Sequence, residues 1–151
     1  VSSWYVRVQA YNSFDWSSHA YPEPSSAVPT LKAPGKVQNP SASVVSGVGL
    51  LVEWDEPSAE LAEFGGDGGA AISEYLLEWD TSEDFDSPAE RLLLPASSRE
   101  YVLGGRDIMT GEESTILEAG MTYYVRLSAF NNQGFGRVSS TSPASATMED
   151  Q

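Results

Sequence analysis

The chain has 151 residues, enough for one sizeable hydrophobic core, and no run of about 18 apolar residues predicts a membrane-spanning helix. It lacks cysteine, which excludes disulfides, thiol catalysis and thiolate metal sites. Its 22 acidic and 8 basic side chains give a net charge of −14, and 13 carboxylates lie between Glu53 and Glu90. This charge argues against nucleic-acid binding and against direct contact with an anionic membrane.

The first predicted strand covers residues 4–12. Alternation at period two predicts that one face points inward and that Arg7 lies on the outer face; the inward residues are Trp4, Val6, Val8 and Ala10. The proline-rich, polar residues 22–35 that follow predict a short, semi-extended joint between modules.

The middle of the chain predicts further short strands separated by turn signals. Residues 37–45 are the weakest candidate, because Pro40 is tolerated only in an edge strand. Residues 50–54 and 75–79 alternate clearly, and residues 91–94 and 100–103 are shorter candidates. Residues 59–64 are the best helical candidate, but the segment is short and runs into two glycines. Six to seven short strands with turn signals between them predict a β-sandwich.

The last clear strand repeats the first one. Residues 123–131 match residues 4–12 in order and in phase, at an offset of 119 residues (123 − 4). A repeat at a domain-sized offset predicts tandem modules of one architecture, of which only the second is long enough here to be whole.

Four motifs in order carry a family resemblance. Trp54-Asp55-Glu56-Pro57 is followed by Tyr75 with Leu77 and Trp79, then by Leu117 to Tyr123 with Val125 and Leu127, and finally by Gly134 and Gly136. This series resembles a fibronectin type III domain over most of residues 34–148. The longer loops at residues 58–71 and 104–115 depart from the family pattern.

The resemblance implies an all-β, immunoglobulin-like antiparallel β-sandwich of about seven strands with fibronectin type III topology. Tyr123 is expected to form a tyrosine corner, in which its hydroxyl bonds to the backbone a few residues upstream. The implied core residues are Trp54, Tyr75, Leu77, Trp79, Tyr123, Val125 and Leu127. Residues 1–30 are expected to be the F and G strands of a truncated preceding module with the start of a linker, residues 31–148 a complete module, and residues 149–151 a tail. A lone hairpin is marginal in water, so the first segment should be poorly ordered or borrow a partner.

Candidate metal and catalytic residues are few. Asp80, Glu83, Asp84 and Asp86 follow a predicted strand and are weak calcium candidates, but their spacing lacks the central Gly and terminal Glu of an EF-hand. His19 is the single histidine and lies in the incomplete hairpin, which disfavours serine and metal hydrolase mechanisms. We therefore expect no catalytic activity, no metal and no cofactor.

The expected function is protein binding or adhesion through loops at the poles of the sandwich. The candidate contact residues are Phe64, Asn132, Gln133 and Phe135, which the fold would place at one pole. The alternatives are a mechanical spacer without a ligand and an accessory module beside a catalytic domain. We expect a monomeric module that contacts a protein partner and its neighbouring modules, in an extracellular or cell-surface setting, with an intracellular one left open.

Overall fold

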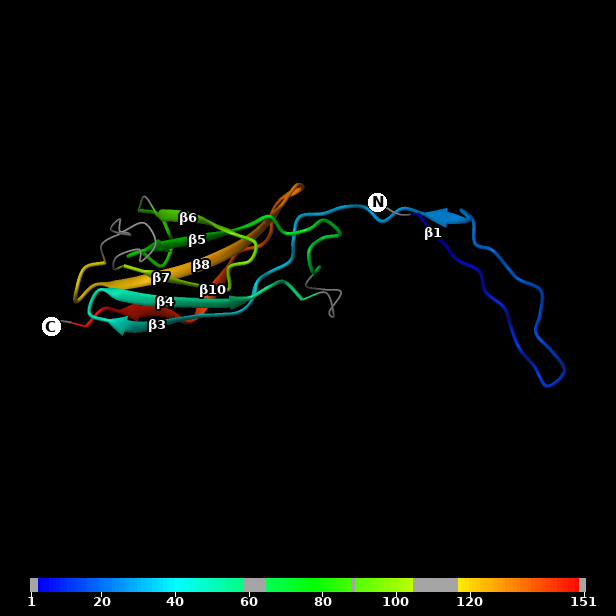
Figure 1. Cartoon of the computed structure of the whole chain (residues 1–151), viewed down its shortest axis with the longest axis horizontal. Helices are drawn as coiled ribbons and strands as arrows, with labels where there is room; N and C mark the ends of the chain where they lie inside the picture. The colour runs from blue at the N-terminus through cyan, green and yellow to red at the C-terminus, as the bar shows by residue number, and fades with distance from the viewer. Residues whose placement is uncertain (1–2, 59–64, 88, 105–116, 150–151) are drawn as a thin grey trace. The chain divides into compact units, whose positions relative to one another are not determined.

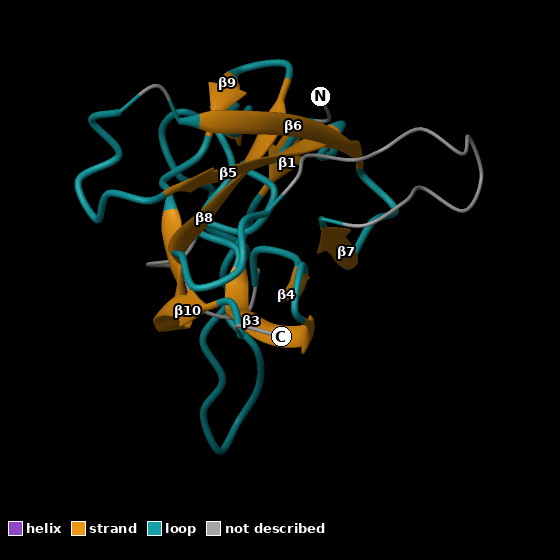
Figure 2. Ribbon diagram, turned by 90° about the vertical axis from the view of Figure 1, so that its left-hand side faces the viewer, coloured by secondary structure: helices purple, strands orange, loops and turns teal. Residues whose placement is uncertain are grey.

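The computed structural model describes residues 3–58, 65–87, 89–104 and 117–149, in which all regular structure is β-strand (Figure 1 and Figure 2). Within these residues no helix could cross a membrane. The chain divides into two compact units, Val1–Leu31 and Lys32–Gln151.

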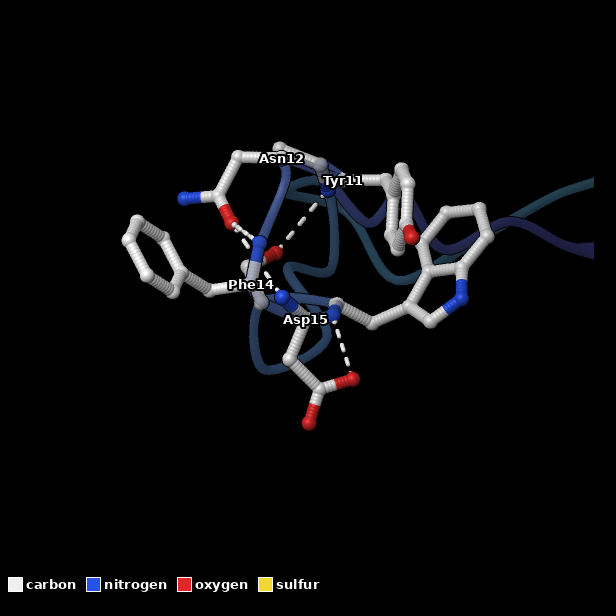
Figure 3. Close-up of a pocket in the computed structure, with 7 residues that line it drawn as sticks. Tyr11, Asn12, Phe14 and Asp15 are labelled. Atoms are coloured by element: carbon white, nitrogen blue, oxygen red, sulfur yellow. Dashed lines mark hydrogen bonds between the residues drawn. The ribbon is translucent and has the colours of Figure 1, made fainter.

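The first unit is a two-stranded antiparallel ribbon. β1 (Trp4–Tyr5) pairs with β2 (Ser26–Ala27), and isolated bridges join Val8 to Ala20 and Tyr11 to Trp16. Figure 3 shows the tip of the ribbon, where Asn12 closes the turn.

Two expectations for this unit are wrong. The predicted inward face is exposed, with Trp4, Val6 and Val8 at 65%, 56% and 64%, because residues 3–31 supply no second layer to cover it. Ser26 and Ala27 were expected in the joint between modules, yet they pair with β1.

The second unit consists of two antiparallel sheets. One sheet has the order β3-β4-β7, from β3 (Gln38–Ser46), β4 (Gly49–Asp55) and β7 (Glu100–Leu103). The other has the order β10-β8-β5-β6, with β9 paired to β8, from β5 (Glu74–Asp80), β6 (Glu90–Pro95), β8 (Thr122–Asn131), β9 (Gly134–Phe135) and β10 (Ser139–Thr147). Pro40 lies in β3, at an edge as predicted.

The predicted alternation fixes the register between β5 and β8. Tyr75 lies opposite Ala129, Leu77 opposite Leu127 and Trp79 opposite Val125. Each of these side chains is less than 5% exposed. Since a slip of one residue would turn every one of them to the other face, burial of this face specifies the pairing.

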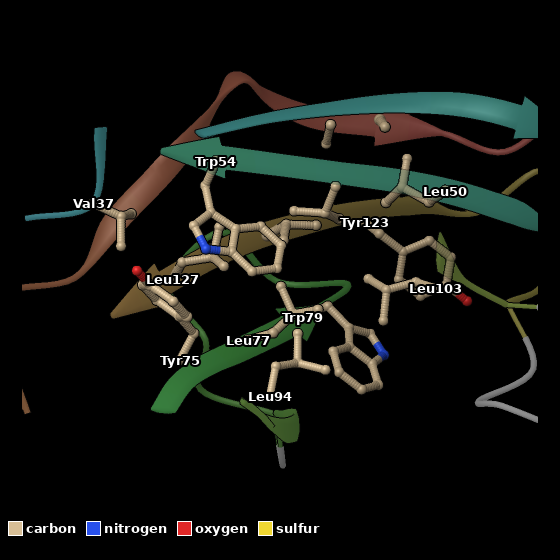
Figure 4. Packing of buried hydrophobic residues seen from close by; sticks show 14 of the residues in the cluster. Val37, Leu50, Trp54, Tyr75, Leu77, Trp79, Leu94, Leu103, Tyr123 and Leu127 are labelled. Carbon is tan, nitrogen blue, oxygen red and sulfur yellow. The ribbon is translucent and has the colours of Figure 1, made fainter. Parts of the chain in front are cut away.

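The core lies between the two sheets (Figure 4). The sheet β3-β4-β7 contributes Leu50, Val52, Trp54 and Leu103, and the opposite sheet contributes Tyr75, Leu77, Trp79, Leu94, Tyr123, Val125 and Leu127. The rings of Trp54 and Tyr75 meet edge to face at 5.6 Å between centroids. All seven residues that the resemblance assigned to the core are therefore buried, and the predicted antiparallel sandwich is confirmed.

The tyrosine corner is present. The Glu118 backbone N–H donates to the Tyr123 hydroxyl oxygen at 3.0 Å, five residues upstream of the ring. The bond ties the segment that precedes β8 to the start of that strand. It confirms the geometry that the resemblance implied for Tyr123.

Candidate functional site

Three segments of the second unit meet at one end of the sandwich, which we call the hairpin pole. They are the β8–β9 hairpin at residues 131–136, the glycine-rich loop at residues 65–70 and the segment at residues 32–35 that precedes β3. The Lys32 N–H donates to the Gly68 carbonyl and the Gly35 N–H to the Gly66 carbonyl, both at 2.9 Å. The described part of the long loop therefore lies beside the segment that enters the sandwich.

Asn131 joins all three segments. Its side chain is 0% exposed at the end of β8. Its Nδ2 donates to the backbone carbonyls of Lys32 and Asp67 at 2.8 Å each, and to that of Ala70 at 3.4 Å. Its Oδ1 accepts the Gln133 N–H at 2.8 Å. One buried amide thus satisfies backbone groups from the entry segment, the glycine loop and the hairpin turn.

Glycine is required at two positions of this pole. A Cβ at Gly68, where φ is +72°, would lie 2.1 Å from the Lys32 carbonyl oxygen. A Cβ at Gly136 would lie 2.4 Å from the Pro34 carbonyl oxygen. Any side chain at either position would therefore force the backbone segments of the pole apart.

The predicted contact residues lie at the tip of the hairpin. Asn132 and Gln133 are exposed, and the Gln133 Nε2 donates to the Asn132 Oδ1 at 2.9 Å. Phe135 is 51% exposed, while its ring packs on that of Phe130 at 4.6 Å between centroids. Phe64 lies outside the described residues. The hairpin therefore presents an aromatic ring that is held in place from one side and open to solvent on the other.

The acidic candidates are not gathered into a set of metal ligands within the described residues. The Asp80 Oδ1 accepts the Ser87 hydroxyl and, at 3.2 Å, the Ser82 N–H. The Ser87 hydrogen bond, opposed by burial, lowers the pKa of Asp80. The carboxylates of Glu83, Asp84 and Asp86 are exposed, and within the described ranges no group of three or more potential ligands could hold a metal ion. Asp80 instead closes the turn after β5.

An ion pair lies on the outer face of the larger sheet. The Arg126 Nε donates to the Glu78 Oε2 at 2.9 Å across directly opposed residues of β8 and β5. The Arg126 guanidinium also lies 4.0 Å from the centre of the Phe85 ring. Arg126 is the counterpart of Arg7, which was predicted to lie on the outer face, and its contacts help to join β8 to β5.

Asn131 is the residue whose role sequence reasoning missed. Alternation alone places Asn131 at the end of the repeated strand, as it places Asn12 at the end of the first copy. A recurring asparagine at a strand end was the available signal, because asparagine can bond to the backbone on both sides of a turn.

Comparison with solved structures gives the fold. The FN1–FN3 domains of chicken CNTN1 superpose with a TM-score of 0.57 at 18% identity, over 99% of this chain and 43% of that one. The fn3 domain of the human collagen alpha-1(XX) chain gives a TM-score of 0.54 at 17% identity, over 83% of this chain and 92% of that one. These likenesses confirm the fibronectin type III fold that the sequence motifs implied.

Comparison with curated proteins finds two relatives. The human ankyrin repeat and fibronectin type-III domain-containing protein 1 is 27% identical over 89% of this chain, and its mouse counterpart is 26% identical over the same share. The chain spans only 10% and 9% of the lengths of these relatives. No protein-family model matches the chain.

Proposed function

We propose that this chain, whose second unit has the fibronectin type III fold, is a non-catalytic part of a larger multidomain protein and binds a protein partner through the hairpin pole. Such modules occur in multidomain proteins, as the names of the curated relatives and the solved structures indicate. Fold alone does not specify a ligand, so the proposal depends on the geometry of the pole.

The observation that carries the proposal is the state of Phe135. Its ring is half exposed, yet it is supported by Phe130 below and by the turn that Asn131 anchors. A rigid exposed aromatic loses little conformational entropy on binding, which is the property of residues that dominate interface energies. Glycines on both sides of Phe135 leave room for a partner to approach the ring.

The net charge of −14 supports a partner with a basic surface. Long-range attraction would speed association without adding contacts at the pole. The association rate should therefore fall as salt is added, whereas the effect of Phe135 should appear mainly in the dissociation rate.

The test begins by finding the partner from the pole itself. A photo-crosslinking side chain is placed at position 133 of the full-length protein, which is expressed in the cells that naturally contain it. A second variant of the same protein carries the crosslinker at position 93. Leu93 is a matched control because it is 51% exposed, as Phe135 is, but lies on β6. We expect a defined crosslinked protein from position 133 and none from position 93.

Affinity is then measured with the purified, unmodified form of the partner that crosslinking has identified. Phe135→Ala should weaken binding by about tenfold or more, as loss of an interface anchor does, and Leu93→Ala should not change it. Loss of the ring contact with Phe130 should also cost about 1 kcal/mol of folding stability, so each variant is first shown to be folded. Equal crosslinking from both positions, or unchanged affinity for Phe135→Ala, would reject the hairpin pole as the binding site and leave a spacing role.

A further inference from the structure

The first unit carries far more apolar surface than a hairpin can cover. Nine large apolar side chains are between 56% and 93% exposed, namely Trp4, Tyr5, Val6, Val8, Tyr11, Phe14, Trp16, Tyr21 and Val28. A small unit that exposes this many large apolar side chains is typical of a site of contact with another surface. The question is which surface covers it.

The backbone of this unit repeats that of β8 to β10 residue by residue. Each pair of opposed residues in the first unit has its counterpart 119 positions later. The break in pairing between Ala20 and Ser26 corresponds to the break between Ser139 and Ser145. The matched pairs are Trp4–Ala27 with Tyr123–Ala146, Tyr5–Ser26 with Tyr124–Ser145, Val8–Ala20 with Leu127–Ser139, and Tyr11–Trp16 with Phe130–Phe135.

The turns agree in their hydrogen bonds as well. The Phe14 N–H donates to the Asn12 Oδ1 at 2.8 Å, as the Gln133 N–H donates to the Asn131 Oδ1 at 2.8 Å. The bonds from Ser17 N–H to the Ala10 carbonyl and from Gly136 N–H to the Ala129 carbonyl both measure 2.7 Å. The paired rings lie 4.9 Å apart at 46° in the first unit and 4.6 Å apart at 47° in the second.

The two copies differ in what covers them. Val125 and Leu127 are 1% and 0% exposed in the second unit, where β5 pairs beside β8 and the opposite sheet packs on its inner face. Their counterparts Val6 and Val8 are 56% and 64% exposed. The two hairpins have the same pairing and the same alternation of apolar residues, but only the hairpin of the second unit is covered by other strands.

The asparagines differ in the same way. The Asn131 Nδ2 donates to carbonyls of Lys32 and Asp67, which precede β8 in the chain. Asn12 makes the same turn contacts through its Oδ1, but its Nδ2 is exposed and the described residues give it no acceptor. By position, the acceptors would come from a segment that precedes β1.

We propose that the face formed by Trp4, Val6, Val8 and Ala10, which we call the first hairpin face, is the docking surface for a segment that precedes Val1 in the full-length protein. That segment is the counterpart of residues 32–121 and completes a second fibronectin type III sandwich. The Asn12 Nδ2 donates to backbone carbonyls of its entry segment and of one of its loops.

Two observations favour this occupant over a second copy of the chain. In the second unit the strands that cover the matching hairpin, β3 to β7, precede it in the same chain. The curated relatives are about ten times as long as this chain, and the superposed CNTN1 structure comprises several such domains and matches 99% of the chain.

Hydrogen exchange tests the proposal by comparing the full-length protein with the 151-residue chain. We expect the amides of residues 4–10 to exchange at least about a hundredfold more slowly in the full-length protein, because they become part of a cooperative sandwich. Residues 123–129 serve as the internal reference and should exchange alike in both proteins. Val8→Asp should abolish the added protection of residues 4–10 and leave the reference protected.

Phe14→Asp is the matched control, because Phe14 is 93% exposed and its counterpart Gln133 is exposed in the complete sandwich. This variant should retain the protection, whereas Asn12→Ala should reduce it at least about tenfold. Three results would overturn the proposal: equal exchange in the two proteins, protection of the 151-residue chain that rises with its own concentration as it dimerises, or a reading frame that supplies no such segment.

Discussion

Asn131→Ala should be among the most destabilising polar substitutions in the second unit. The change removes two Nδ2 hydrogen bonds of 2.8 Å, to the Lys32 and Asp67 carbonyls, and the Oδ1 bond from the Gln133 N–H. At about 1 kcal/mol for each bond, the loss is about 3 kcal/mol. The weaker contact with Ala70 at 3.4 Å adds little.

Urea unfolding followed by tryptophan fluorescence measures this loss, because Trp54 and Trp79 are buried in the core of the same unit. For a slope of about 2 kcal/mol per molar urea, the midpoint should fall by about 1.5 M. Asn132→Ala is the control, since this neighbour is exposed and should change stability by less than about 0.5 kcal/mol. Asn131→Asp retains acceptors but loses the donor, so it should be at least as destabilising as the alanine variant.

The reasoning would be refuted by a loss below about 1 kcal/mol for Asn131→Ala, or by equal losses for Asn131→Ala and Asn132→Ala. A small loss would mean that water replaces the buried amide, and equal losses would mean that the buried amide contributes no more than its exposed neighbour. The entry segment, the glycine loop and the hairpin would then be held together without this side chain.

Two tyrosines and one aspartate give further predictions. Tyr123→Phe should cost about 1 kcal/mol in urea unfolding, because the Glu118 N–H loses its acceptor, and an unchanged midpoint would contradict the tyrosine corner. Tyr75→Phe should leave the midpoint unchanged or raise it, since the buried hydroxyl has no partner among the described residues and a clear drop would reveal one. The pKa of Asp80 in the folded state is below its ordinary value of 3.8, chiefly because the Ser87 hydroxyl donates to its carboxylate. Asp80 therefore contributes its full share to folding stability well above pH 3.8, and this share is lost as the pH falls through the folded-state pKa. Ser87→Ala should therefore destabilise the protein at pH 7 and reduce the acid sensitivity of the unfolding midpoint; an unaltered pH profile would exclude this role.

The first hairpin shows where local sequence information ends. The alternation of residues 4–12 predicted the strand, and the repeat predicted that it is built like residues 123–131. The same pattern predicted burial, and within the chain this was wrong for Trp4, Val6 and Val8. Alternation records which face a strand can bury, whereas burial needs a second layer.

The sandwich itself could be read from the sequence because its strands follow a local rule. Period-two alternation in residues 50–54, 75–79 and 123–129 specifies one apolar face for each strand, and burying these faces together yields the two sheets and their register. The motif order then pointed to the fibronectin type III fold, including the bond at Tyr123.

Only the tertiary structure decided which polar groups meet. The Asn131 side chain donates to backbone carbonyls that lie 99 and 64 residues earlier in the chain. The tertiary structure also decided that the Phe135 ring packs on Phe130 while remaining half exposed. Tyr75 and Tyr123 are both buried tyrosines on strands, yet only the Tyr123 hydroxyl has a partner within the described residues. Hydrogen bonds require atoms to meet within about 3 Å, and that proximity arises only after the strands and loops have packed.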